Sequence, residues 1–105
     1  MAMSNDVTQV DPTKMVEWAR QHELAAERCA AARKEHPRTI AAAASWGPMF
    51  ADARKAAVDA VNAREAALIE QENRHREMAL TLKRGAAVMQ ATNDENARNL
   101  RLSQS

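Results

Sequence analysis

The chain has 105 residues, of which 24 are alanine, and it contains two glycines, three prolines, one phenylalanine and no tyrosine. This length fits one domain at most, and an aromatic content of 3 % cannot fill the wide core of a β-sandwich. A net charge of +1 argues against a dedicated nucleic-acid-binding protein, because such proteins normally carry a strong basic excess. The alanine-rich, charged composition favours long helices packed closely through small side chains.

Residues 1–10 are polar and show no helical pattern, so we interpret them as a flexible N-terminal tail. They lack the basic and apolar regions of a signal peptide. The longest stretch without charge, Thr39 to Ala51, is about half the length that crosses a bilayer. We therefore expect a protein that is cytoplasmic before export, has no membrane insertion, and reaches the medium or cell envelope without a cleavable signal peptide.

The first predicted helix covers residues 12–35. Asp11 can cap it, and Pro12 suits the first helical position. Pro37 ends it, because the residue before a proline is pushed out of helical geometry. Small and apolar residues recur in this helix at spacings of three and four, which defines one face. The face comprises Met15, Trp18, Ala19, His22, Ala25, Ala26, Cys29 and Ala32.

A bend is predicted over residues 37–48. Its first part, residues 38–45, contains four consecutive alanines and is compatible with one or two helical turns. Trp46, Gly47 and Pro48 form the predicted turn, because Gly47 supplies backbone freedom and Pro48 can open the next helix.

The second predicted helix runs from residue 48 to about residue 100, because no proline follows Pro48. Residues 101–105 are expected to fray. An apolar stripe close to a heptad spacing follows this helix, interrupted at Arg64 and Gln71. The stripe comprises Phe50, Ala57, Val61, Leu68, His75, Met78, Leu82, Gly85 or Ala86, and Met89. The sequence predicts that Glu65, Glu70 and Glu77 lie largely on solvated faces.

The two helices predict an all-α fold, a helical hairpin of two long antiparallel helices over residues 11–100 with the second helix much longer. At 1.5 Å per residue they span roughly 36 Å and 80 Å. Helix one should therefore cover helix two only to about residue 78. The predicted hairpin seam contains Met15, Trp18, His22, Phe50, Val61, Leu68 and His75. Beyond it, the predicted partner interface contains Met78, Leu82, Ala86 and Met89.

Candidate catalytic and metal-binding residues are few. His22 and Cys29 lie seven residues apart on one face, but no third ligand at a suitable spacing accompanies them. His75 has only Glu72 and Glu77 nearby, which we interpret as surface glutamates. We therefore predict that these three residues pack within the seam, and that the protein is not an enzyme and uses no cofactor or metal.

The N-terminal pattern resembles the first helix of the EspC-like family, whose members are small proteins associated with type VII (ESX) secretion. The pattern reads Val10-x-Pro12-x-x-Met15-x-x-Trp18-Ala19-x-x-His22-x-x-Ala25-Ala26. The family typically has leucines where Met15 and Trp18 stand. Gly47-Pro48 at the start of the long helix, Met78-Ala79-x-x-Leu82, and the small residues Ala86 and Ala87 extend the resemblance to residues 8–100. The family is similar to secreted helical hairpins with a Trp-x-Gly turn, although Trp46 directly precedes Gly47 here.

The resemblance also implies an export motif, Tyr-x-x-x-Asp/Glu, late in the second helix. Aligned on the family, the tyrosine position falls at Met89 and the acidic position at Asn93, with Asp94 one residue out of register. The motif is therefore degenerate, and a partner chain could supply it.

Two functions follow from the resemblance and from the unpaired stripe. The first is a non-catalytic type VII secretion-associated protein, exported or co-exported as a dimer with a partner through its helical face. The alternative is a cytosolic adaptor or chaperone-like partner of a larger type VII substrate or toxin. The implied partners are a helical chain in a hetero- or homo-oligomer, a secretion ATPase or the larger substrate, with no nucleic acid. A coiled-coil homo-oligomer unrelated to secretion is the third class.

Overall fold

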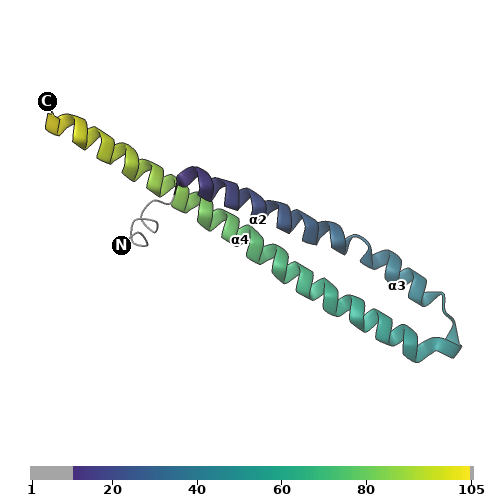
Figure 1. Ribbon diagram of the computed structural model, residues 1–105. Helices are drawn as coiled ribbons and strands as arrows, with labels where there is room; N and C mark the ends of the chain where they lie inside the picture. The colour runs from purple at the N-terminus through teal and green to yellow at the C-terminus, as the bar shows by residue number, and fades with distance from the viewer. Residues whose placement is uncertain (1–10, 105) are drawn as a thin grey trace, which may run out of the picture. The chain divides into compact units, whose positions relative to one another are not determined.

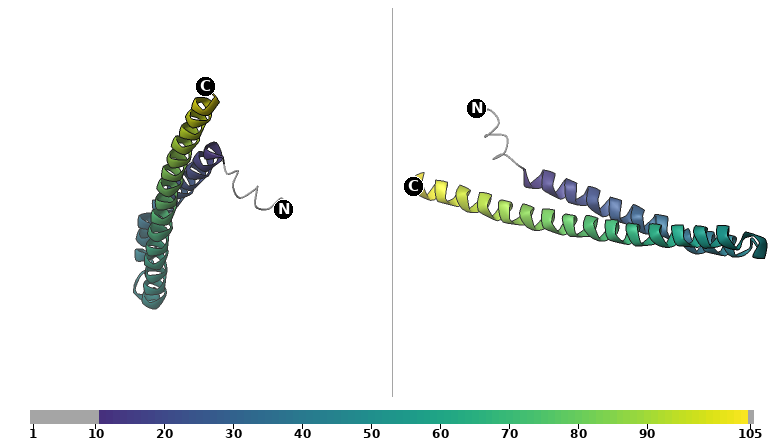
Figure 2. Two further views of the ribbon diagram at one scale, coloured as in Figure 1. Left: turned by 90° about the vertical axis from the view of Figure 1, so that its left-hand side faces the viewer. Right: turned by 90° about the horizontal axis from the view of Figure 1, so that it is seen from below.

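A computed structural model describes residues 11–104 of the protein. Helix α2 spans Pro12–Arg33, α3 spans His36–Ala44, the 3₁₀ helix η1 spans Pro48–Phe50, and α4 spans Ala51–Gln104 (Figure 1). The views in Figure 2 show α4 as one continuous helix, although it contains Gly85. The predicted tail at residues 1–10 lies outside the described residues.

The chain divides into two compact units, and α2 and α4 each contribute to both. The described part of unit 1 comprises residues 11–23 and 77–104. In unit 2, residues 24–76, the end of α2 and the whole of α3 pair with the first half of α4. The pairing is antiparallel within each unit (Figure 1). The predicted fold class, an all-α helical hairpin with a longer second helix, is confirmed.

The element boundaries differ from the sequence analysis in two places. Most of the predicted bend is helical, because α3 covers nine residues and its proline occupies the first turn, where a missing N–H costs nothing. Helix α4 continues to Gln104, four residues beyond the predicted end at about residue 100. Between α2 and α3, the Lys34 amide donates to the Ala31 carbonyl (3.2 Å) and closes the turn.

Small side chains form the buried seam of both units. The buried residues recur at intervals of seven, the repeat of interlocking helices: Ala19 and Ala26, then Cys29, His36 and Ala43, then Ala79 and Ala86. No large side chain is fully buried among the described residues. Alanines allow the helix backbones to approach closely, but each removes little apolar area from water. The paired helices therefore have a thin core, and small domains without other reinforcement are marginal in stability.

No helix within residues 11–104 has the length and apolar character needed to cross a membrane.

Candidate functional site

Unit 2 contains a network of charged side chains that crosses its helix seam. Arg33, in the last turn of α2, donates from Nε to Glu65 Oε1 (2.7 Å) and from Nη1 to Glu72 Oε1 (3.2 Å). Arg76 Nε donates to the other oxygen of Glu72 (3.1 Å). The two glutamates lie seven residues apart on α4, so both face the neighbouring helices. One arginine therefore links two turns of α4 to the end of α2.

His36, the first residue of α3, completes this network and is buried, with 5 % of its surface exposed. Its Nδ1 hydrogen-bonds to Glu65 Oε2, and its Nε2 lies 3.0 Å from Arg64 Nη1. Because a guanidinium can only donate, Nε2 accepts from Arg64 and Nδ1–H donates to Glu65. A neutral histidine in this tautomer satisfies both ring nitrogens.

The network shifts the acid–base behaviour of its members. Hydrogen bonds from Arg33 and His36, together with the positive charge of Arg33, lower the pKa of Glu65 below its usual value. Glu65 and Glu72 together raise the pKa of Arg33. The carboxylate of Glu65 thus joins α2, α3 and α4 at one point.

The sequence analysis missed this network. Glu65, which we expected largely on a solvated face, lies on the seam, and the side chain of Glu72 is only 16 % exposed. Both glutamates occupy seam positions of the heptad repeat. The predicted stripe followed mainly apolar residues, so it did not include them. The signal that could have located them was the seven-residue interval between the two glutamates, opposite Arg33 and His36.

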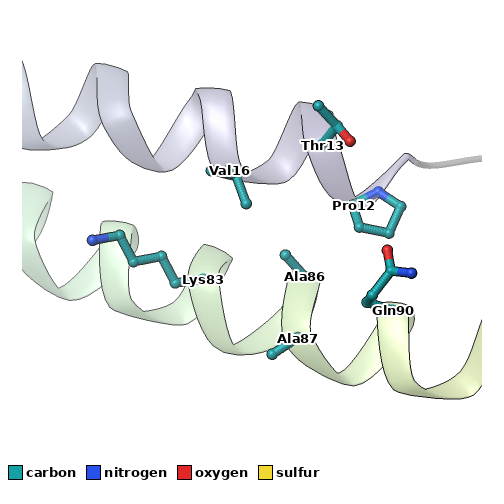
Figure 3. A pocket seen from close by; sticks show the side chains of 7 residues that line it. All are labelled: Pro12, Thr13, Val16, Lys83, Ala86, Ala87 and Gln90. Atoms are coloured by element: carbon teal, nitrogen blue, oxygen red, sulfur yellow. The ribbon is translucent and has the colours of Figure 1, made fainter.

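Unit 1 carries a groove between the start of α2 and α4, with a volume of about 410 Å³. Pro12, Thr13, Val16, Lys83, Ala86, Ala87 and Gln90 line it. Figure 3 shows Val16 pointing from α2 toward α4, and Gln90 pointing toward Pro12. The Thr13 amide donates to Asp11 Oδ1 (2.9 Å), which caps α2 here, and Lys83 forms an ion pair with Glu23.

This geometry corrects the expected reach of the first helix. The prediction that it covers the long helix only to about residue 78 is wrong, because Pro12 and Gln90 line the same groove. A Cβ added at Gly85 would lie 2.7 Å from Cε of Met15. Ala86, predicted at a partner interface, is 4 % exposed and belongs to the intramolecular seam. The nine helical residues of α3 add about 13 Å to the first half of the hairpin.

The other residues of the predicted interface and seam have mixed positions. Leu82 and Met89 are half-buried, whereas Met78 is 46 % exposed. The half-buried seam residues are Met15, His22, Val61, Leu68 and His75. Trp18 and Phe50 are about half exposed, whereas Ala19, next to Trp18, is fully buried.

His22, Cys29 and His75 have no metal-binding arrangement around them. Within residues 11–104, no group of three or more histidine, cysteine or acidic side chains could hold a metal ion. Cys29 is buried, and its thiol lies 3.9 Å from Oε1 of Gln71.

The final 14 described residues of α4, 91–104, are all exposed. They include two of the three degenerate motif positions, Asn93 and Asp94. Gln90 Nε2 donates to Oδ1 of Asp94 (3.1 Å), so this carboxylate bonds within its own helix. We call residues 91–104 the C-terminal extension.

The helices and their seam define a class of small hairpin proteins with a thin core. The model of a known protein family, described as excreted virulence factor EspC, type VII ESX diderm, matches residues 3–101. The chain belongs to this family, which confirms the resemblance, and it is a type VII secretion-associated protein. Neither the curated proteins nor the solved structures include a significant match.

Proposed function

We propose that the protein has a non-catalytic role in type VII secretion and is exported or co-exported as a dimer with a helical partner chain. The observation that carries this proposal is the C-terminal extension, a helix with no buried residue. It includes Thr92, Asn93, Asp94, Asn96 and Asn99, which have low intrinsic helix propensity. Most helical stability in proteins comes from packing, so such a segment gains stability when another helix covers it.

The proposed partner surface combines this extension with the exposed side chains of unit 1. Ala86 is removed from the predicted interface, because it is already buried within the chain. Met78 remains, and Val88, with 66 % of its surface exposed, joins it. A partner helix that packs beside them in a coiled-coil arrangement would bury apolar surface that the thin seam cannot.

A truncation tests this proposal. A tagged full-length protein and a version ending at Gln90 are expressed in the native host, and the culture filtrate and affinity-purified complexes are analysed by mass spectrometry. We expect the full chain to enter the filtrate and to copurify with one helical partner, and the truncated chain to lose both. Because the truncation removes no buried side chain, its thermal unfolding followed by circular dichroism should change little.

Substitutions at the proposed surface provide the finer test. Met78→Glu and Val88→Glu should reduce partner binding and leave helix content unchanged, because both side chains are exposed. Ala67→Glu introduces the same charge at an exposed position of unit 2, outside the proposed surface, and is the control. Full export and unchanged copurification of the truncated chain would rule out the proposed surface.

The alternative is a cytosolic adaptor or chaperone-like partner of a larger type VII substrate. The degenerate motif favours it, because Met89 and Asn93 stand where the family's tyrosine and acidic residue are expected. The double variant Met89→Tyr with Asn93→Asp restores both positions. If the natural chain stays in the cytosol and the double variant enters the filtrate, the alternative is supported. Secretion of both chains to the same extent would exclude it.

A further inference from the structure

The connection between α3 and α4 lies at one end of unit 2 (Figure 1). It exposes three large apolar side chains. Met49 is 87 % exposed, Phe50 54 % and Trp46 45 %. Trp46 and Phe50, with Ala53, line an open groove of about 350 Å³. We call Trp46, Met49 and Phe50 the apolar tip. Three large apolar side chains exposed within five residues form a patch rather than scattered surface residues.

The backbone holds the apolar tip in a defined turn. Gly47 has φ 80° and ψ 175°, a conformation available essentially to glycine alone. Pro48 then begins η1, and the Phe50 amide donates to the Gly47 carbonyl (3.3 Å). The Ser45 and Trp46 amides donate to carbonyls of α3 at 3.1 Å and 3.2 Å. The backbone of the tip is therefore ordered, so little backbone entropy is lost when its side chains bind.

The charges beside the apolar tip are net positive. Between residues 38 and 59 the chain has three basic residues, Arg38, Arg54 and Lys55, and two acidic residues, Asp52 and Asp59. Within residues 11–104, none of the three basic side chains forms an ion pair. Arg33, in the last turn of α2, is by contrast neutralised by Glu65 and Glu72.

We propose that the apolar tip binds the surface of an anionic lipid bilayer. Tryptophan and phenylalanine partition to the interface between headgroups and acyl chains. Unpaired lysine and arginine side chains beside them are attracted to anionic headgroups. The basic side chains favour an anionic surface over a neutral protein groove, and the exposed tryptophan and phenylalanine favour a lipid interface over an acidic groove.

Such binding is peripheral. The expected absence of membrane insertion refers to helices that cross a bilayer. No helix within residues 11–104 is long and apolar enough to do so. A turn with three exposed apolar side chains needs to reach only the depth of the headgroups and the first acyl carbons. The proposal thus concerns attachment of unit 2 to a membrane surface and is independent of the partner surface on unit 1.

The two tryptophans of the chain permit a direct test. In the full-length Trp18→Phe variant, Trp46 in the apolar tip is the only fluorescent indole. This variant is titrated with vesicles of phosphatidylglycerol and phosphatidylcholine, and with vesicles of phosphatidylcholine alone. We expect a blue shift of Trp46 emission and flotation with the anionic vesicles. Partitioning should be at least about tenfold weaker with the neutral vesicles.

Two sets of variants separate the contributions of apolar and basic groups. Met49→Ser combined with Phe50→Ser should weaken partitioning by at least about tenfold. Arg54→Gln combined with Lys55→Gln should weaken it and reduce its dependence on salt. Ile69→Ser, at an exposed apolar residue of α4 outside both the tip and the proposed partner surface, should have no effect. Circular dichroism verifies that each variant keeps its helix content.

The proposal is overturned if Trp46 emission does not shift with anionic vesicles at low salt. It is also overturned if the Met49 and Phe50 double variant floats as well as its parent. Binding that is equal for anionic and neutral vesicles would contradict the role assigned to Arg54 and Lys55.

Discussion

Unit 2 and unit 1 hold their paired helices by different means. In unit 2, Arg33, His36, Glu65 and Glu72 bond across the seam, and these bonds are satisfied at one register of the helices. In unit 1, alanines and Gly85 provide close approach, with an ion pair between Lys83 and Glu23. A seam of small residues packs similarly after a shift of one heptad, so it specifies register weakly. The difference indicates that the register of the paired helices is specified mainly in unit 2.

The largest expected effect tests the small-residue seam of unit 1. Ala86→Glu places a charge at a buried position and should destabilise the protein by about 3–5 kcal/mol, which can exceed its total stability. Ala87→Glu, one residue later and exposed, should change the free energy of unfolding by less than about 0.5 kcal/mol. Urea unfolding followed by circular dichroism measures both. Equal effects would mean that unit 1 has no defined seam.

The next effect tests the polar network of unit 2 through pH. Glu65 has a lowered pKa when folded, so its stabilising contribution is complete above its unfolded pKa and is lost as pH falls through the folded value. Glu65→Gln should therefore destabilise the protein at pH 7, and its difference from the natural chain should shrink below about pH 4. Thermal unfolding across pH 3–7 measures this difference.

The control for this experiment is Glu70→Gln, which removes an exposed carboxylate paired with Arg74 on the same helix. It should lower stability at pH 7 by only about 0.3–0.5 kcal/mol. If the two variants showed the same pH profile, the network would contribute nothing beyond an ordinary surface ion pair.

A smaller effect is expected at the turn of unit 2. Gly47→Ala should cost about 1–3 kcal/mol, because alanine disfavours a φ of 80° with an extended ψ. The cause is the backbone alone, since an added Cβ would meet no atom within 4 Å. Met49→Ala, at an 87 % exposed neighbouring site, is the control and should leave stability nearly unchanged. Chemical denaturation distinguishes them, and a neutral Gly47→Ala would contradict the assigned backbone conformation.

The smallest effect concerns Gly85 in unit 1. Replacing a helix-interior glycine with alanine gains up to about 1 kcal/mol, but the new Cβ would lie 2.7 Å from the Met15 methyl group. That methyl group ends a flexible side chain and can move, so Gly85→Ala should be neutral or slightly stabilising. The gain should increase in a Met15→Ala background. A double-mutant cycle measures this coupling, and additive effects would show that the two residues do not meet.

Local sequence features were sufficient for the fold class. Three local features predicted the helices and the turn without knowledge of any distant contact, because each acts over a few residues. They are the alanine content, the breaker residues Gly47 and Pro48, and the cap at Asp11. The family pattern around Pro12 and His22 was equally local. The polar network and the length of the first half of the hairpin were not predictable in this way, because both depend on which distant residues lie opposite each other.

The sequence by itself therefore determined that this protein is helical, turns once near Gly47, and belongs with small type VII secretion-associated hairpins. Only the tertiary structure decided that Glu65 joins three helices, that Ala86 is already buried, and that the open helical surface is the C-terminal extension. The physical reason is that helix propensity is set by neighbouring residues, whereas register is set by the few side chains that must meet across the seam.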